Sequence, residues 1–131
     1  MKQKWEYARA KHSLDKVKEI KESYQEDNQT AYASYTFKLG KEIITNGLGQ
    51  ALARINVSSG KDAVMYERLY KDLSEWLLQK HPTPPYKGED LLYEIIHGSR
   101  ESYRFATVEA LAWLSWHQQF VSTYLKLDRG V

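Results

Sequence analysis

Apolar residues recur at intervals of three and four along most of this chain, which is the spacing of one face of an α-helix. The first stripe predicts a helix over residues 3–25 and consists of Ala10, Leu14, Val17, Ile20 and Tyr24. Glu22, Glu26 and Asp27 follow, and the dipole at the C-terminal end of a helix disfavours anions. We therefore expect this helix to end by residue 25 and residues 25–29 to form a loop.

A second helical stripe begins near Thr30, and glycines interrupt the helical pattern after it. Gly40 predicts a bend. The run TNGLGQALA at 45–53 predicts a break between two helices. Glycine, and less readily asparagine, adopts the left-handed conformation that ends a helix. Residues 46–47 would thus end one helix, and Gly49 would begin the next.

A third helical pattern, with a wide apolar band, covers residues 61–79. SSG at 58–60 separates it from the preceding helix, and Ser59 is its predicted N-cap. The three prolines are confined to the segment HPTPPYKGED at 81–90. Because proline disrupts the interior of a helix, we expect this segment to be a loop.

Two more helices complete the predicted fold. A short one is expected over residues 88–97, and a last one, VEALAWLSWHQQFVSTYLKL, over residues 108–127 with Thr107 as its N-cap. The last helix is apolar on most sides, which is typical of a central helix. Alternation typical of strands is absent from the sequence. The prediction is an all-α fold, a compact single-domain bundle of five to seven helices over residues 1–131.

Composition excludes several classes of protein. The 131 residues include no cysteine, which excludes disulfides, thiolate catalysis and cysteine-based metal sites. No apolar run approaches the roughly 20 residues that a membrane helix needs. The charged N-terminus also lacks the apolar core of a signal peptide. We therefore expect a soluble, cytoplasmic protein without a membrane partner.

Charge is unevenly distributed, although the net charge is only +2. Against one anion, Glu42, residues 30–61 hold the cations Lys38, Lys41, Arg54 and Lys61. The first helix carries one row of Lys4, Lys11 and Lys18, and a neighbouring row of Arg9 and Lys16. These nine residues are our candidates for contact with a polyanion such as RNA. Ordinary solvated helix faces account for the charge pattern equally well.

The sequence offers little for catalysis. The histidines, which lack the spacing of a helical metal site, are His12, His81, His97 and His117. No phosphate-binding glycine loop or serine elbow occurs. The aromatic surroundings of His117 favour a packed, hydrogen-bonded residue over a ligand or base. We expect no enzyme activity, no cofactor and no small-molecule substrate, and a helical hydrolase or nuclease is the alternative that an assay must exclude.

Two segments of the sequence form a distinctive pattern when they occur together. NGLGQALA at 46–53 is followed by a basic residue, and T-x-EALAWLSWHQQF spans 107–120. Further matching positions are Tyr35, Trp76-Leu77 and Tyr103-Arg104. With these motifs, the chain resembles the small subunit of the type III-B CRISPR effector, the Cmr complex. The resemblance covers nearly the whole chain. Arg104 is a weaker candidate for RNA contact, because it can instead pair with Glu109.

The resemblance implies a small all-α protein without catalytic activity of its own. Several copies would stack beside the backbone subunits and line the duplex of CRISPR RNA and target RNA. The implied partners are therefore both RNAs, other Cmr subunits and further copies of this chain. A duplex held whatever its sequence is contacted at its phosphates and 2′-hydroxyls. The alternative, suggested by the many Trp and Tyr residues, is a helical adaptor that acts only through protein contacts.

Overall fold

The computed structural model describes residues 2–58 and 63–127. These residues form α1 (Lys2–Ser23), α2 (Glu26–Asn46), α3 (Leu48–Ser58), α4 (Ala63–Glu75), the π-helical turn η2 (Trp76–Lys80), α5 (Leu91–His97) and α6 (Arg100–Tyr124). No strand occurs among them, and the all-α prediction with five to seven helices is confirmed. Within the described residues, no helix has the length and apolar character needed to span a membrane.

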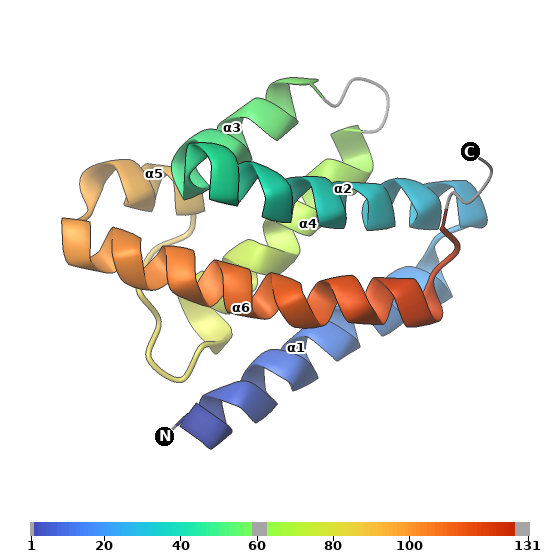
Figure 1. The fold of residues 1–131 in the computed structure, drawn as a ribbon, viewed down its shortest axis with the longest axis horizontal. Coiled ribbons are helices and arrows are strands. Elements are labelled where there is room, and N and C mark those ends of the chain that lie inside the picture. Colours follow the sequence, from blue (N-terminus) through green and yellow to red (C-terminus); the bar gives the residue numbers. More distant parts are fainter. Residues whose placement is uncertain (1, 59–62, 128–131) are drawn as a thin grey trace.

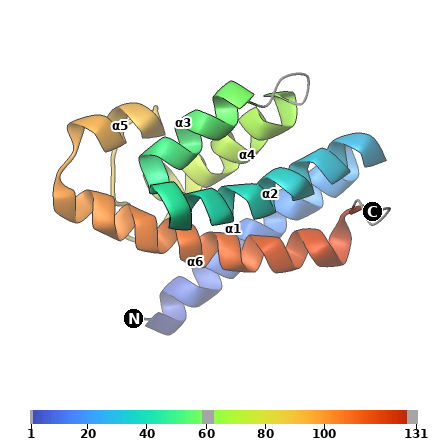
Figure 2. The same cartoon turned by 45° about the horizontal axis from the view of Figure 1, so that its top comes forward.

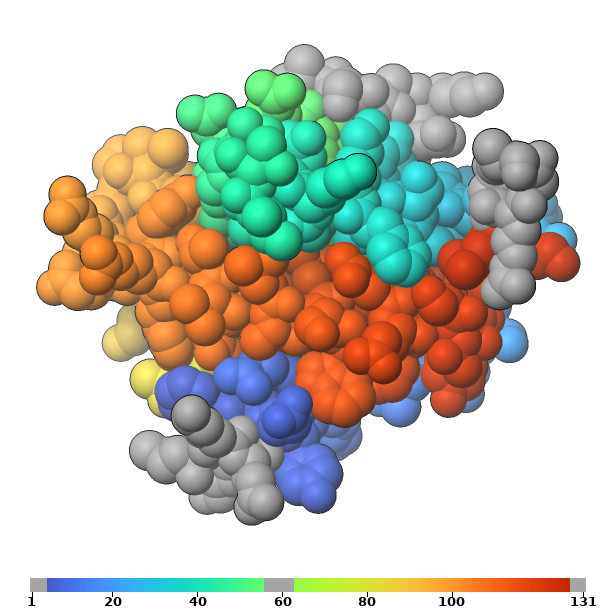
Figure 3. Space-filling model, viewed as in Figure 1, coloured from blue at the N-terminus to red at the C-terminus, as the bar shows by residue number. Residues whose placement is uncertain are grey.

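The long C-terminal helix α6 packs against α1, α2 and η2. α2 lies beside α6 and runs in the opposite direction, and α1 crosses α6 obliquely (Figure 1). α3 and α4 pack against α2, and α5 contacts α3 (Figure 2). Buried side chains from these helices form a core in which Trp76, Trp113 and Tyr32 are among the largest. The apolar last helix thus supplies large core side chains, but one side of it lies at the surface (Figure 3), so it is not enclosed on most sides as its pattern predicts.

The second helix begins earlier than predicted. α2 starts at Glu26, so the expected loop over residues 25–29 is wrong. Glu26 and Asp27 occupy the first turn of α2, where the helix dipole stabilises anions. The side-chain amide of Gln29 donates to the carbonyl oxygen of Tyr24 at 2.8 Å, which satisfies a backbone acceptor just past the end of α1. The carboxylates that disfavour a longer α1 therefore favour the start of α2 at residue 26.

α2 continues through Gly40 without a break. A Cβ atom at Gly40 would lie 2.6 Å from Nε2 of Gln118 on α6. The missing side chain therefore leaves room for the amide of Gln118 between α2 and α6.

The predicted break between α2 and α3 is confirmed, and it falls at Gly47. This residue has φ of 88° and ψ of 159°, a combination that is essentially restricted to glycine. Its N–H donates to the carbonyl oxygen of Ile43 at 2.9 Å, and its carbonyl oxygen accepts from the N–H of Ala51 at 3.0 Å. One residue thus closes α2 and opens α3, which begins at Leu48, one position before the predicted Gly49.

The predicted helix over residues 61–79 is divided into α4 and η2. The N–H of His81 donates to the carbonyl oxygen of Trp76 at 2.9 Å, which closes the π-helical turn. The wider turn buries three successive side chains, Trp76, Leu77 and Leu78, and no periodicity in the sequence predicts it. Ser59, the expected N-cap, lies outside the described residues. The proline loop is confirmed, and the predicted short helix is α5, which ends at His97 as predicted but begins at Leu91, after the expected start at residue 88.

The last helix begins at Arg100, well before the predicted cap at Thr107. Oγ of Ser99 accepts a hydrogen bond from the N–H of Ser102 at 3.1 Å and is the actual N-cap. Thr107 lies inside α6, where its hydroxyl donates to the carbonyl oxygen of Tyr103 at 2.8 Å. The Thr107 prediction was wrong because a hydroxyl side chain bonds the backbone at a cap and within a helix alike.

Gly47→Ala should lower the melting temperature. A non-glycine residue in this backbone conformation costs about 1–3 kcal/mol. Gly49→Ala is the matched control, because an added Cβ there would meet Ile95 at an ordinary 3.5 Å and alanine favours a helix. Thermal unfolding followed by circular dichroism measures both variants. A Gly47→Ala chain that melts at the wild-type temperature would contradict the backbone assignment.

Candidate nucleic-acid interface

α2 presents two of the predicted RNA contacts to solvent. One face of this helix packs into the core with Tyr32, Leu39 and Ile43. Lys38 and Lys41, which are three positions apart, share the opposite side and are exposed. Among the described residues, no acid forms an ion pair with either lysine. Both ammonium groups are therefore available to an external anion.

Arg54 of α3 lies close to these lysines through a contact with α2. Its side chain is 62% exposed, and its Nε lies 3.4 Å from Oε1 of Glu42. An exposed pair of this kind contributes at most about 1 kcal/mol, so the guanidinium can exchange it for a phosphate contact. We name Lys38, Lys41 and Arg54 the basic patch. Figure 3 shows the C-terminal half of α2 at the molecular surface, beside α6.

Arg9 and Lys16 of α1 are committed to ion pairs within the fold. Nε and Nη2 of Arg9 donate to the two carboxylate oxygens of Glu109, each at 2.9 Å. Nζ of Lys16 lies 2.9 Å from Glu75, and the two basic side chains are 15% and 16% exposed. Removing one partner from a covered ion pair leaves an uncompensated charge. These two candidates therefore fix α1 in place, and the structure does not bring them to the basic patch.

The remaining candidates lie elsewhere on the surface or beyond the described part of the chain. Lys11 and Lys18 are exposed on α1, and Nζ of Lys18 lies 5.0 Å from the ring centroid of Tyr124. Both lysines belong to α1, which crosses α6 obliquely, whereas the basic patch belongs to α2 and α3 (Figure 1). Lys61 lies outside the described residues, and so does the side chain of Lys4.

Glu109 pairs across the fold and not with Arg104. Besides Arg9, its 3% exposed carboxylate accepts a hydrogen bond from Nε2 of His81 at 2.9 Å. The alternative in which Arg104 pairs with Glu109 is therefore wrong. Positions five apart lie on different faces of a helix, and Arg104 is exposed on α6 whereas Glu109 points inward.

His12 and His81 use both ring nitrogens within the fold. Nδ1 of His12 accepts from the indole N–H of Trp113 at 2.9 Å, so Nε2 carries the proton and donates to Glu75 at 2.8 Å. Nδ1 of His81 likewise accepts from the backbone N–H of Thr83 at 2.8 Å. A general base needs a free lone pair that faces its substrate, and neither ring has one.

His117 is a fully buried core residue, as predicted. The hydroxyl of Tyr32 donates to Asp72 at 2.6 Å, so it accepts from Nε2 of His117 at 2.7 Å. The hydroxyl of Ser13 then donates to Nδ1 at 2.7 Å. Arg68 compensates Asp72 at 2.9 Å. Among the described residues, no group of acids and histidines could hold a metal ion.

The exposed side of α6 carries no charge over residues 105–124, a feature that the sequence analysis missed. The one ionisable acid in this stretch, Glu109, is buried. The exposed residues, which we name the uncharged α6 surface, are Val108, Ser115, Gln119, Ser122 and Thr123. Ile44 of the neighbouring α2 is 76% exposed. Depletion of charge is typical of the centre of a protein–protein interface.

Residues 5–124 match the family model described as CRISPR-associated protein (Cas_Cmr5). The chain belongs to this family. The X-ray crystal structure of a CRISPR-associated Cmr5 family protein from Thermus thermophilus has the same fold, with a TM-score of 0.71, 23% identity, and coverage of 92% of this chain and 96% of that chain. The resemblance inferred from the two sequence segments is confirmed, and it is consistent with a small subunit of the Cmr complex in CRISPR defence.

Acid should destabilise this Cas_Cmr5 chain. Burial is the largest cause that lowers the pKa of His12, His81 and His117. Below about pH 6.5 the unfolded chain therefore takes up protons that the folded chain does not, and the free energy of unfolding falls as pH falls. Burial also raises the pKa of Asp72 to about 6. Below that pH, protonation of Asp72 in the folded chain raises the free energy of unfolding. This one carboxyl opposes the effect of three histidines.

Melting temperatures measured between about pH 7.5 and pH 5.5 test this expectation. His12→Gln keeps a donor for Glu75 but cannot titrate, so its melting temperature should decline less steeply over the same range. A wild-type melting temperature that is constant or rises toward acid would contradict the assignment of neutral buried histidines.

Proposed function

We propose that this chain is a non-catalytic small subunit of a type III-B CRISPR effector that contacts RNA through the basic patch, in antiviral defence. Membership of the Cas_Cmr5 family supports its place in a Cmr complex. The observation that carries the RNA contact is the pair of exposed lysines on α2, Lys38 and Lys41, next to Arg54. Lysine and arginine attract phosphates whatever the base sequence. This suits a subunit that must hold the duplex of any CRISPR RNA with its target RNA.

Several copies of the chain stack along the duplex in this proposal. A patch of three cations binds weakly alone, and repetition along one RNA raises the overall affinity without any new kind of contact. Lys4, Lys11, Lys18 and Lys61 are secondary candidates for RNA contact. Arg9 and Lys16 are left out, because their charges are compensated inside the fold.

The uncharged α6 surface is the proposed contact with a neighbouring subunit or copy. Covering exposed apolar residues with a partner is favourable, and the polar members of this surface are uncharged, so no charge among them has to be desolvated. Val108 and Ile44 are 61% and 76% exposed and supply apolar area. The second candidate function, a helical adaptor without RNA contact, would use this same surface and leave the basic patch in solvent.

Removing positive charge from the basic patch should weaken capture of target RNA by the assembled complex. The test variant is Lys38→Glu/Lys41→Glu/Arg54→Gln. Each phosphate contact contributes about 0.7–0.9 to the slope of log affinity against log salt, so both the affinity and this slope should decrease. Fluorescence anisotropy of a labelled target RNA at several salt concentrations measures them.

Lys71→Glu/Lys80→Glu/Lys87→Gln is the matched control for that experiment. It changes net charge equally at three other exposed positions and should leave RNA capture nearly unchanged. Circular dichroism verifies that both variants fold. If the basic-patch variant captures target RNA with wild-type affinity and salt slope, this face is not the RNA contact and the adaptor function is favoured.

Val108→Lys should reduce incorporation of the chain into the assembled complex. It places a charge on the uncharged α6 surface, and burying an unpaired charge at an interface is costly. Val64→Lys is the control, because Val64 on α4 is 62% exposed, nearly the same as Val108. Native mass spectrometry of the purified complex counts the copies that each variant supplies. Equal incorporation of the two variants would exclude α6 as the contact surface.

A further inference from the structure

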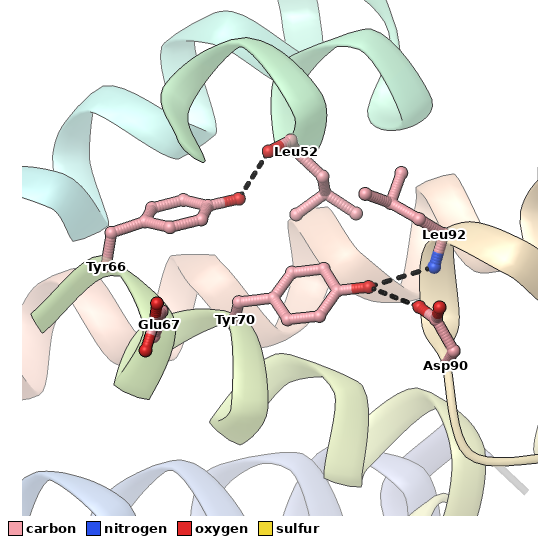
Figure 4. A pocket seen from close by; sticks show the side chains of 6 residues that line it. All are labelled: Leu52, Tyr66, Glu67, Tyr70, Asp90 and Leu92. Carbon is pink, nitrogen blue, oxygen red and sulfur yellow. Dashed lines mark hydrogen bonds between the residues drawn. The ribbon is translucent and has the colours of Figure 1, made fainter. Parts of the chain in front are cut away.

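A pocket of about 310 Å³ opens between α3, α4 and the start of α5. Its lining residues are Leu52, Tyr66, Glu67, Tyr70, Asp90 and Leu92 (Figure 4). Leu52 and Tyr66 are almost fully buried and form its floor, whereas Glu67 and Asp90 are exposed. The volume is at the lower end of the range for small-molecule sites, which is about 300–1,000 Å³. The pocket therefore suits one side chain better than a large ligand.

The fold holds both tyrosine rings of the pocket in place. The hydroxyl of Tyr66 donates to the carbonyl oxygen of Leu52 at 2.5 Å. The hydroxyl of Tyr70 donates to Oδ1 of Asp90 at 3.0 Å and accepts from the N–H of Leu92 at 2.9 Å. Figure 4 shows the two rings side by side, both extending from α4 toward α3 and α5. Both hydroxyls are engaged within the fold, and Tyr70, the more exposed of the two tyrosines, lines the pocket.

The charged side chains that line the pocket are acidic. Glu67 and Asp90 are acids, and none of the described lining residues is a lysine or arginine. Within the described part of the chain, neither carboxylate forms an ion pair with a cation. Oδ1 of Asp90 accepts from Tyr70, and its other oxygen makes no hydrogen bond to the residues drawn in Figure 4. A positively charged group at the rim of the pocket would therefore find a carboxylate acceptor.

We propose that this pocket binds an arginine side chain of a protein partner. A guanidinium is planar, so it can stack on the face of Tyr70 while it donates to a carboxylate in the bidentate geometry that arginine favours. The methylene groups of the arginine would lie against Leu52 and Leu92, as long basic side chains commonly do on apolar surface. Apolar floor, aromatic wall and acidic rim thus match the three parts of one side chain.

The same charges disfavour RNA as the occupant. Two carboxylates at the rim repel the phosphates that carry most of the affinity of a protein for nucleic acid. The proposed RNA contact, the basic patch, shares none of the lining residues of this pocket. The arginine site is therefore independent of the proposed RNA function, and each can fail without the other.

An NMR titration of the isotopically labelled full chain with N-acetyl-L-arginine N-methylamide tests the proposal. One side chain binds weakly, so the probe is added to millimolar concentration. Amide signals of Leu52, Leu92 and their neighbours should shift in a saturable manner. The corresponding citrulline and lysine derivatives are the control probes, because citrulline has the shape without the charge and lysine has the charge without the plane.

Glu67→Gln/Asp90→Asn should weaken binding of the arginine probe by about tenfold or more, since a hydrogen bond to a charged group contributes about 1.5–3 kcal/mol. Both substitutions keep the side-chain shape, and Asp90→Asn keeps an oxygen acceptor for Tyr70. Glu89→Gln/Glu101→Gln removes two exposed acids outside the pocket and should bind the probe normally. The amide spectrum of each variant shows directly whether it is folded.

Four results of this titration would overturn the proposal. They are shifts of equal size with the citrulline derivative, equal shifts with the lysine derivative, unchanged binding by Glu67→Gln/Asp90→Asn, and shifts confined to residues outside the pocket. A short RNA duplex that shifts the same pocket amides would also overturn it, because the acidic rim would then not exclude nucleic acid. Saturable arginine shifts that the double variant removes would support it.

Discussion

A buried chain of hydrogen bonds from Asp72 through Tyr32 and His117 to Ser13 connects four helices. Its bonds are 2.6, 2.7 and 2.7 Å long, and its members come from α4, α2, α6 and α1 in turn. All four side chains are buried, so no water can replace a missing partner, and an unsatisfied group there costs about 1–3 kcal/mol. The rotation of each helix about its own axis is therefore fixed by the same set of polar atoms.

This constraint decides what the basic residues of each helix can do. Tyr32 points inward, and the helical repeat then turns Lys38 and Lys41 to solvent. On α1, Ser13 points inward, and Arg9 and Lys16 share its side of the helix, where Glu109 and Glu75 meet them. Residues of one chemical type thus become surface cations on one helix and structural cations on another. Which role a basic residue takes depends on its angular position on the helix relative to the residue that joins the buried hydrogen-bond chain.

The sequence was sufficient for the fold class, the glycine break, the proline loop and the family, because each has a local signal in spacing or composition. Arg9 and Lys16 carried a local signal that was overlooked: they follow the three- and four-residue spacing of Ser13, Val17 and Ile20, which are buried. Their partners could not be predicted, since Glu109 lies 100 positions from Arg9. The starts of α2 and α6 were missed because acids and hydroxyl side chains have more than one stable place near a helix end. Lys38, Lys41 and Arg54 were chosen from sequence as RNA contacts, and that role stays a prediction.

The proline loop between η2 and α5 is tied at both ends. At its start, His81 is held by Glu109 and by the N–H of Thr83; at its end, Asp90 and the N–H of Leu92 are held by Tyr70. Three prolines within residues 81–90 further reduce the conformations open to the unfolded segment. Little backbone entropy is left for this segment to lose when a partner arrives. A partner that binds next to α5 would thus meet a loop that already has its final conformation. Such preorganisation favours affinity from a small contact area.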